Sequence, residues 1–436
     1  MNAYKTIMLS QQTATTLPIR ADRRNACPGL SRMVMSKDGA IARVKLALGR
    51  LNSREARALA DIATAFGNGS VELSIRSNVQ IRGIQPANWD QAISALYEAG
   101  FGADNPSADD IRNVMVSPTA SIDATSLATS LLTVLETTPE YHRLSPKFSF
   151  QIDGGEDCAV TAHSGDIWLS AMDNGTHYAF GLASSPDADA IGMIEKTQAL
   201  SLIKALLDTF QCHAQNGIAR MKHLFEAMPK SQFLQELPVA FAQAPDWKRK
   251  PTKPFSWLGT HAQNNVRSYI GAMPFLGRLQ SAQLHALAQV ADNANGGKIR
   301  LTPWQSIILP DIENADLEKV SSGLEELGFA ISSEQPQARL RACSGSSGCA
   351  SAFADTLADA KQLAAQLVAR LDQVHITGCS KSCAALSPLP HTLLARSKEH
   401  YDLFSQDKAG PSRFGQLLAS NITIDEAAQL LNAQNL

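Results

Sequence analysis

The chain has 436 residues, 44% of which are hydrophobic, and its 39 basic residues nearly balance its 41 acidic residues to give a formal net charge of −2. This length allows two or three domains with large cores, and so small a net charge excludes a general electrostatic attraction to nucleic acid. The sequence lacks a run of about eighteen apolar residues, the length that a membrane-spanning helix needs. We therefore expect neither a nucleic-acid partner nor a membrane partner.

The N-terminal segment and the cysteine count bear on the compartment. Residues 1–10 hold too short an apolar stretch for a secretory signal. The chain has 7 cysteines, and an odd number does not favour a framework of disulfides. These features predict a cytoplasmic protein with reduced cysteines.

A duplicated unit is visible in the sequence. Leu48-Gly-Arg-Leu-Asn-Ser53 matches Leu276-Gly-Arg-Leu-Gln-Ser281 at an offset of 228 residues, and the match continues without a gap to Ile84 and Ile312. Of these 37 aligned positions, 12 are identical. A constant offset over that length indicates a duplication rather than a local bias in composition.

Each copy predicts the same elements in the same order. Ser53 or Ser281 can cap a helix whose apolar residues recur at helical spacing, and glycines end that helix. A strand is then expected over residues 71–81 in the first copy and over residues 298–308 in the second.

Further helices, near residues 88–99 and 315–327, complete a β-hairpin-plus-helix unit in each copy. Alternation along the strand of the first copy puts Arg76, Asn78 and Gln80 on one face. That face is polar without being simply charged, which favours ligand contact over a solvated surface.

A longer α/β segment is expected after each unit, from about Asp110 to Pro238 and from about Arg339 to the end. The Pro-rich stretch 244–254 predicts a linker between the two halves.

Four cysteines in the second of these segments form two close pairs. Cys343 and Cys349 are spaced C-x5-C, and Cys379 and Cys383 are spaced C-x3-C, while Cys27, Cys158 and Cys212 are left over. Two pairs of thiolates suit a 4Fe–4S cluster because each iron of the cubane takes one sulfur. The small residues between Cys343 and Cys349 let the backbone close around it.

Two alternatives to the cluster remain. Zinc is the main metal alternative, but its usual cysteine pairs are spaced C-x2–4-C, so C-x5-C fits poorly. Four unrelated buried thiols would require a chance clustering of a residue type that makes up 7 positions in 436.

The cysteine spacing resembles that of the sulfite/nitrite reductase superfamily. Three more segments fall in the family's order and resemble its anion-binding stretches: Arg76–Gly83, Asp110–Val114 and Leu144–Phe148. In that family the last cysteine, Cys383 here, lies between the cluster and a tetrapyrrole site. The resemblance implies a duplicated α+β fold with two ferredoxin-like half-domains and two α/β cluster-type domains in a pseudo-twofold arrangement.

The same resemblance implies four domains. The ferredoxin-like half-domains are expected at residues 18–105 and 255–334. An α/β tetrapyrrole-binding domain without a cluster is expected at residues 106–243, and the α/β 4Fe–4S domain at residues 335–436.

A tetrapyrrole with many acetate and propionate groups is a polyanion, so its site needs several converging arginines and lysines. The sequence singles out no catalytic residue. We expect the substrate-binding residues to be Arg76, Asn78, Gln80, Arg82, Arg112, Asn113, Lys147 and Arg300.

Two positions depart from the reductase pattern or from the duplication. Classical sulfite reductases carry a Lys-x-Lys pair where this chain has Lys147-Phe148-Ser149, and the missing second lysine weakens a site for sulfite or nitrite reduction. Trp304 occupies the position of the second copy that matches Arg76. We expect it either to pack in the protein interior or to form an aromatic wall of the tetrapyrrole pocket.

Within the superfamily, the flanking segments resemble the precorrin-3B synthases. They are Arg24–Leu30, Lys37–Val44, Phe66–Gly83 and Met273–Leu279. The resemblance implies O2-dependent hydroxylation of precorrin-3A at C20, with lactone formation, in aerobic cobalamin biosynthesis. The implied partners are precorrin-3A, O2 and NAD(P)H-derived electrons that arrive through a reductase or ferredoxin.

A mononuclear non-haem iron is also implied, and the nearest hint of its ligands is a group of carboxylates and imidazoles close in sequence: Asp157, His163, Asp166, Asp173 and His177. One alternative function is a siroheme-dependent sulfite or nitrite reductase, in which siroheme would be the cofactor. Another is an iron–sulfur electron carrier or tetrapyrrole-binding protein without chemistry of its own.

Overall fold

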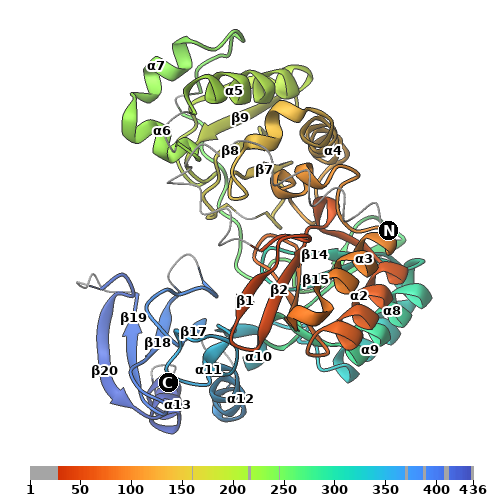
Figure 1. The fold of residues 1–436 in the computed structure, drawn as a ribbon, viewed down its shortest axis with the longest axis vertical. Coiled ribbons are helices and arrows are strands. Elements are labelled where there is room, and N and C mark those ends of the chain that lie inside the picture. The colour runs from red at the N-terminus through yellow and green to blue at the C-terminus, as the bar shows by residue number, and fades with distance from the viewer. Residues whose placement is uncertain are drawn as a thin grey trace.

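The computed structural model describes residues 28–159, 161–214, 218–244, 246–368, 372–385, 389–406 and 412–433. Cys27, most of the resembling segment Arg24–Leu30 and the domain boundary expected at residue 18 lie outside these residues. Figure 1 shows one central block of strands and helices, with a second α/β unit above it and a third at its lower left.

The central block consists of two antiparallel five-stranded sheets, one for each copy of the duplicated unit. The first sheet has the order β1 (Val34–Ser36), β2 (Gly39–Val44), β5 (Val79–Ile84), β4 (Ser70–Leu73) and β13 (Arg278–Gln280). The second has the order β11 (Gly259–Ala262), β12 (Arg267–Ala272), β15 (Ile307–Glu313), β14 (Lys298–Leu301) and β3 (Arg50–Asn52).

Each copy gives one short strand to the sheet of the other copy. Strand β3 of the first copy pairs with β14, and β13 of the second copy pairs with β4. The backbone N–H of Ser53 donates to the carbonyl of Gly297, and that of Ser281 donates to the carbonyl of Gly69, each at 2.9 Å. The two halves therefore close each other's open sheet edge.

Helices of both copies share one hydrophobic core. The long helices α2 (Ser53–Phe66) and α8 (Ser281–Asn295) lie side by side, as Figure 1 shows, and α3 (Trp89–Glu98) and α9 (Leu317–Glu326) flank them. Buried residues of both copies, such as Leu59 and Leu287, belong to the same cluster. The predicted helices are confirmed in both copies.

The strand expected over residues 71–81 is wrong, because the chain reverses in the middle of it. Strands β4 and β5 form a hairpin, and the residues between them make a turn in which Ser77 has a positive φ of 55°. The Ser74 carbonyl accepts the N–H of Ser77, and the Ser74 hydroxyl accepts the N–H of Asn78. Arg76 therefore lies in the turn and not on a strand face.

The second copy makes the same turn at the same offset. The strand expected over residues 298–308 is likewise divided into β14 and β15, with Gln305 at a φ of 57° in the position of Ser77. The match between the copies extends to the left-handed residues Leu48 and Leu276, with φ values of 54° and 55°. The duplication is therefore present in the backbone as well as in the sequence.

Two α/β units follow the two copies, and their sheets have the same topology. In each five-stranded sheet the first three strands are parallel and the last two are antiparallel. The strands are β6 (Val114–Val116), β7 (Phe150–Asp153), β8 (Ile167–Ala171), β9 (His177–Leu182) and β10 (Gly192–Glu195), then β16 (Leu340–Ala342), β17 (Val374–Thr377), β18 (His391–Ala395), β19 (Tyr401–Ser405) and β20 (Gln416–Ile422).

Helices of the α/β units pack around separate cores. They are α4 (Ile122–Thr137), α5 (Ala199–His213), α6 (Met221–Ala227) and α7 (Lys230–Gln235) in the first unit, and α12 (Thr356–Gln366) and α13 (Ile424–Ala433) in the second. The short helices α10 (Pro336–Arg339) and α11 (Gly345–Gly348) lie outside the core of the second unit, and Ala338 of α10 packs in a cluster with Trp257 and Met273. Among the described residues, none of the helices has both the length and the apolar character that crossing a membrane requires.

Short 3-10 helices join many of these elements. They are η2 (Ala47–Gly49), η3 (Pro86–Asn88), η4 (Pro106–Ile111), η5 (Pro139–Arg143), η6 (Lys196–Gln198), η7 (Phe275–Gly277) and η8 (Asn314–Asp316). The duplicated α+β fold predicted from the sequence is confirmed.

In the second copy, Gly277 packs closely against the turn residue Gln305, and a substitution at Gly277 can test this contact. Its φ is 69°, and a Cβ atom there would lie 2.6 Å from Cβ of Gln305. Gly296 has a similar φ of 73°, but a Cβ atom there would meet nothing within 4 Å. Gly296→Ala should therefore cost only the left-handed backbone strain, about 1–2 kcal/mol, whereas Gly277→Ala should cost about 1–3 kcal/mol more through overpacking. Urea unfolding measures both, and equal losses of stability would contradict the contact.

Candidate functional site

The paired cysteines follow the carboxyl ends of two parallel strands. Strands β16 and β17 pair in register, Ala342 opposite Ile376, so Cys343 and the segment that leads to Cys379 leave the sheet side by side. The Sγ atom of Cys343 accepts the backbone N–H of Gly378 at 3.2 Å. A Cβ atom at Gly378 would lie 2.5 Å from Cβ of Ala352, so only glycine fits at this close approach.

The charges of the other three paired cysteines act on Cys383. Partial loss of contact with water raises the pKa of the Cys383 thiol, and the charges of Cys379, Cys343 and Cys349 raise it further. None of the four forms a disulfide, and Cys383 is exposed while the other three are partly covered. Four thiolates this close repel each other unless cations lie between them, which is what the irons of a 4Fe–4S cluster would provide.

The donor set and its surroundings therefore fit a 4Fe–4S cluster. Each sulfur would bind its own iron, and N–H groups such as that of Gly378 are the kind of donors that tune cluster sulfurs. Among the described residues, no group of three or more His, Cys, Asp or Glu side chains is placed to hold a single metal ion. Ligands of a single metal ion must converge on one point, whereas each cysteine of a cubane binds a different iron.

The ligands hinted at for a mononuclear iron are dispersed in the structure. The Asp166 carboxylate, which is buried, accepts from Nε of Arg220 at 2.6 Å. Asp173 is exposed and pairs with Lys250, and Nδ1 of His177 lies 2.8 Å from the hydroxyl of Thr176. These contacts do not locate a second iron.

The first ferredoxin-like copy holds the cysteine loop in place. Nη2 of Arg82 and the hydroxyl of Ser36 both donate to the carbonyl of Gly348, at 2.8 and 2.6 Å. The ammonium of Lys37 donates to the carbonyl of Ser346 at 2.6 Å. Because Gly348 directly precedes Cys349, these bonds fix the position of one cluster ligand relative to the central block.

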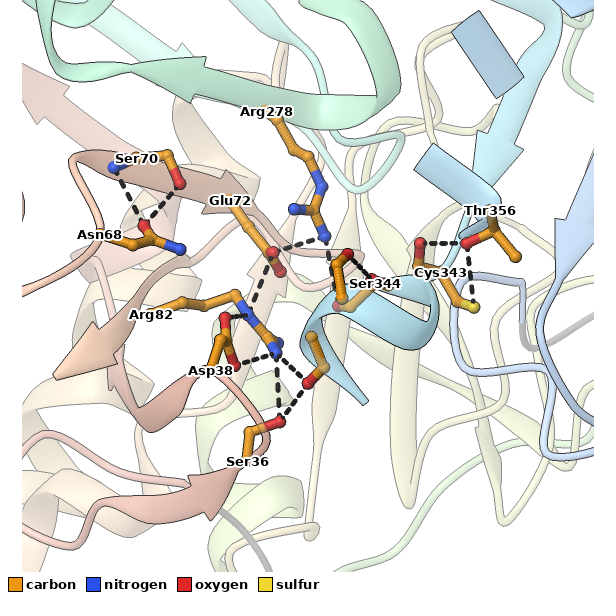
Figure 2. Close-up of polar contacts among 12 residues, drawn as sticks. Ser36, Asp38, Asn68, Ser70, Glu72, Arg82, Arg278, Cys343, Ser344 and Thr356 are labelled. Atoms are coloured by element: carbon orange, nitrogen blue, oxygen red, sulfur yellow. Dashed lines mark hydrogen bonds and ion pairs between the residues drawn. The ribbon is translucent and has the colours of Figure 1, made fainter. Parts of the chain in front are cut away.

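A set of carboxylates orients the arginines of this interface, as Figure 2 shows. Asp38 accepts from Nε and Nη2 of Arg82 at 3.0 and 2.9 Å. Glu72 lies 3.5 Å from Arg82 and 2.5 Å from Arg278, whose Nη2 also donates to the hydroxyl of Ser344. Sequence reasoning missed Asp38, Glu72 and Arg278, because their roles depend on contacts between distant segments.

The residues expected to bind the tetrapyrrole do not form one polar face. Arg82 is engaged by protein groups at the cysteine loop. Oδ1 of Asn78 accepts the N–H of Leu46 at 3.0 Å. Gln80 lies opposite Arg43 in the sheet, and its amide oxygen, when it is turned toward the guanidinium, accepts from Arg43 at 2.9 Å. Asn78 and Gln80 therefore serve the structure of the half-domain.

Asn113 and Arg112 are also engaged within the protein. Nδ2 of Asn113 donates to the carbonyls of Pro146 and Phe148, so this side chain fixes the loop on both sides of Lys147. Nε of Arg112 lies 2.7 Å from Glu136. Arg300 donates from Nη1 to the carbonyl of Pro118 at 2.8 Å and lines the same cavity as Arg112.

Arg76 has a neighbour in the first α/β unit. Burial lowers the pKa of His163 to about 4, and the positive charge of Arg76 contributes to that shift. The imidazole of His163 is therefore neutral near pH 7 and lies close to the guanidinium of the turn. His163 belongs to the first α/β unit, from which Lys147 also comes.

The pseudo-twofold counterpart of this region is filled by side chains. Trp304, which stands at the position of Arg76, stacks on Trp257 with ring centroids 4.0 Å apart and an angle of 5° between the planes. Arg341 is buried beside Met273, and its burial lowers the pKa of the guanidinium to about 10. Trp304 therefore serves packing, whereas the equivalent position of the first copy holds a charged side chain.

Comparison with known families agrees with this architecture. Residues 34–99 and 261–327 match the model of the nitrite/sulfite reductase ferredoxin-like half domain, and residues 107–244 match that of the nitrite and sulphite reductase 4Fe-4S domain. The chain belongs to the nitrite and sulfite reductase family. This membership supports a 4Fe–4S cluster, although the paired cysteines lie outside the matched ranges and remain predicted ligands.

Several relatives of different activity are about equally similar in sequence. A precorrin-3B synthase of Sinorhizobium sp is 27% identical over 406 residues, which cover 89% of this chain and 85% of that protein. A ferredoxin–nitrite reductase of Synechococcus elongatus is 29% identical over 384 residues, which cover 79% and 73%. The NirA protein of Mycobacterium tuberculosis has the same fold, with a TM-score of 0.69 over 91% of this chain and 80% of that chain at 21% identity.

The first prediction from this site concerns the cluster ligands Cys343, Cys349, Cys379 and Cys383. Serine at any one of them should lower the iron and acid-labile sulfide content and the broad visible absorption, because each thiolate holds one iron. The control variants are Cys158→Ser and Cys212→Ser, which change free thiols that lie elsewhere and should leave both contents unchanged. Full iron and sulfide in the Cys379→Ser protein would contradict the assignment.

A second prediction concerns the burial of His163 beside Arg76. The pKa of this imidazole is about 4 in the folded protein and 6.5 for the ordinary side chain. Between these values only the unfolded chain binds the proton, so the free energy of unfolding should fall as the pH falls from about 6.5 to about 4. Urea unfolding at pH 7 and pH 5 should show a smaller loss for His163→Gln than for the parent. Equal losses in the two proteins would contradict the lowered pKa of this partly buried imidazole.

Proposed function

We propose that the protein acts as a precorrin-3B synthase, which hydroxylates precorrin-3A at C20 with O2 and forms a lactone in aerobic cobalamin biosynthesis. The observation that carries this proposal is the extent of the match to a precorrin-3B synthase, 89% of this chain and 85% of that protein. The matches to the nitrite reductase of Synechococcus elongatus and to a sulfite reductase of Mycobacterium tuberculosis cover 79% of this chain and 73% and 67% of those proteins.

The position of Ser149 supports the same proposal. It stands where sulfite reductases carry the second lysine of their Lys-x-Lys pair, and here it is 3% exposed. Its backbone N–H donates to Oδ2 of Asp166 at 2.9 Å, and Asp166 is itself bound by Arg220. A buried serine supplies neither the positive charge nor the ammonium proton that reduction of sulfite or nitrite would use.

Hydroxylation of a carbon atom by O2 places one oxygen atom in the product and reduces the other to water with two electrons. A bound 4Fe–4S cluster would supply those electrons one at a time, and NAD(P)H-derived electrons would reach it through a reductase or ferredoxin. The protein's own part is to orient the macrocycle and to exclude water. For this we propose Arg76 and Lys147 as contacts of the substrate carboxylates, because charged side chains hold carboxylates through strong hydrogen bonds.

A siroheme-dependent nitrite or sulfite reductase is the second candidate. It is favoured by the 29% identity to a ferredoxin–nitrite reductase, which is no lower than the identity to the precorrin-3B synthase. In that case the tetrapyrrole would be a resident cofactor rather than a substrate.

Turnover under labelled oxygen tests the proposal. The purified protein with an electron source should consume O2 only when precorrin-3A is present, and one atom from 18O2 should enter the product hydroxyl, as measured by mass spectrometry. Reduction of nitrite or sulfite, with no O2 uptake on precorrin-3A, would reject the proposal in favour of the reductase. Tetrapyrrole binding without either reaction would favour a non-catalytic carrier or binding protein.

Two variants separate binding from electron supply in this assay. Arg76→Ala should weaken tetrapyrrole binding about tenfold to hundredfold, because charge-assisted hydrogen bonds contribute about 1.5–3 kcal/mol, and should spare the iron content. Cys383→Ser should abolish turnover, because it interrupts the cluster at the cysteine expected to lie nearest the substrate. Unchanged affinity in the Arg76→Ala protein would remove this residue from the substrate site.

A further inference from the structure

A cavity of about 500 Å³ lies where the strand exchange of the second sheet meets the first α/β unit. Its wall includes η2, strand β3, strand β14 and the start of the segment that leads to β6. This volume is within the range of small-molecule sites in proteins. Five cationic side chains line it: Lys45, Arg50, Arg112, Lys298 and Arg300.

Two of these cations stand directly opposite each other in the sheet. Arg300 of β14 and Arg50 of β3 are partners in the antiparallel register. Like charges at directly opposed positions destabilise a sheet. Burial and the charge of Arg50 lower the pKa of Arg300, which is the expected consequence of holding two guanidinium groups together.

The other exchanged strand provides an internal comparison. Arg278 of β13, the counterpart of Arg50, lies opposite Glu72 of β4, and their side chains are 2.5 Å apart. Glu72 and Arg300 occupy equivalent positions of the two copies, 228 residues apart. The same pair of positions therefore holds opposite charges near the cysteine loop and two positive charges at this cavity.

The nearby carboxylates offset the charge of the arginine pair only in part, because burial and the charge of Arg50 lower the pKa of Arg300 while the charge of Asp311 raises it. Lys298 is paired with Asp311 at 2.8 Å, and the carboxylate of Glu55 accepts the N–H of Asn52 as part of a helix cap. In the part of the chain that the structure describes, neither Arg50 nor Arg300 forms an ion pair with a carboxylate. Arg300 has a neutral partner, the carbonyl of Pro118.

We propose that Arg50 and Arg300 form a binding site for a small anionic ligand that carries two or more carboxylate or phosphate groups. Two guanidinium forks can hold such groups bidentately and relieve their own repulsion. Leu51, Phe101 and Ile299 supply an apolar wall that suits a ligand with a short carbon skeleton. The cavity is lined neither by the paired cysteines nor by Arg76 or Lys147, so the site does not depend on the proposed function.

The second sheet can be given the charge pattern of the first by a single change, Arg300→Glu. This variant places Arg50 opposite a glutamate, as Arg278 already is, so it should fold and should be at least as stable as the parent without ligand. It should bind anions at least about tenfold more weakly, because it removes one guanidinium and adds a negative charge. Arg50→Gln is a second variant that removes one guanidinium without adding a carboxylate.

The experiment is a titration of thermal unfolding with pyrophosphate and with citrate, against sodium chloride of equal ionic strength. The parent should show a saturable rise of several degrees in its unfolding temperature with at least one probe. Both variants should show a much weaker rise, and the better probe identifies a phosphate or a carboxylate ligand. No saturable rise in the parent, or the same rise in Arg300→Glu, would overturn the proposal, and neither outcome depends on turnover of a tetrapyrrole.

Discussion

Exchange of one short strand between the two ferredoxin-like copies is the constraint on which the rest of the structure depends. Strands β3 and β13 each have three residues, too few to be stable alone, yet each closes the sheet of the other copy. The two copies then bury a single core. Neither sheet can form its full set of strands without the other, so the relative orientation of the two halves is fixed within one hydrophobic core. The contacts that hold the cysteine loop, from Arg82 and Lys37 to Gly348 and Ser346, start from this fixed block.

The two ferredoxin-like copies have the same backbone but differ in single residues at equivalent positions, and these residues give the copies different chemistry. Arg76 of one copy is replaced by Trp304 of the other, and the tryptophan stacks on Trp257 where the arginine lies near His163. Glu72 is replaced by Arg300, which exchanges an ion pair for two opposed guanidinium groups. The backbone keeps the same turns in both copies, so these differences alter chemistry without altering the fold.

Much of the fold could be predicted from the sequence because the signals are local or repeated. The constant offset between the copies and the helical spacing of apolar residues predicted helices α2, α3, α8 and α9. The cysteine spacing predicted a cluster site, and Figure 2 shows one of its cysteines, Cys343, next to Ser344 and Thr356. The turn at residues 74–78 was missed because its left-handed position is Ser77, whereas glycine is the usual signal for a positive φ. Strand exchange was missed because three-residue strands carry no periodicity.

The candidate site was harder to predict than the fold for a physical reason. An arginine or asparagine in a family-like segment has the same sequence signal whether it faces a ligand or satisfies buried backbone groups. Asn113 spans the carbonyls of Pro146 and Phe148, and Arg82 spans Asp38 and Gly348. Only the tertiary contacts reveal these structural uses.

If the tetrapyrrole is a substrate that comes and goes, as proposed, it should not stay bound to the purified protein, whereas a 4Fe–4S cluster should. The most direct test is a metal, sulfide and chromophore analysis of protein purified without oxygen. We expect about four irons and about four acid-labile sulfides per chain at the paired cysteines, and no extractable tetrapyrrole. One siroheme extracted per chain would contradict the proposal.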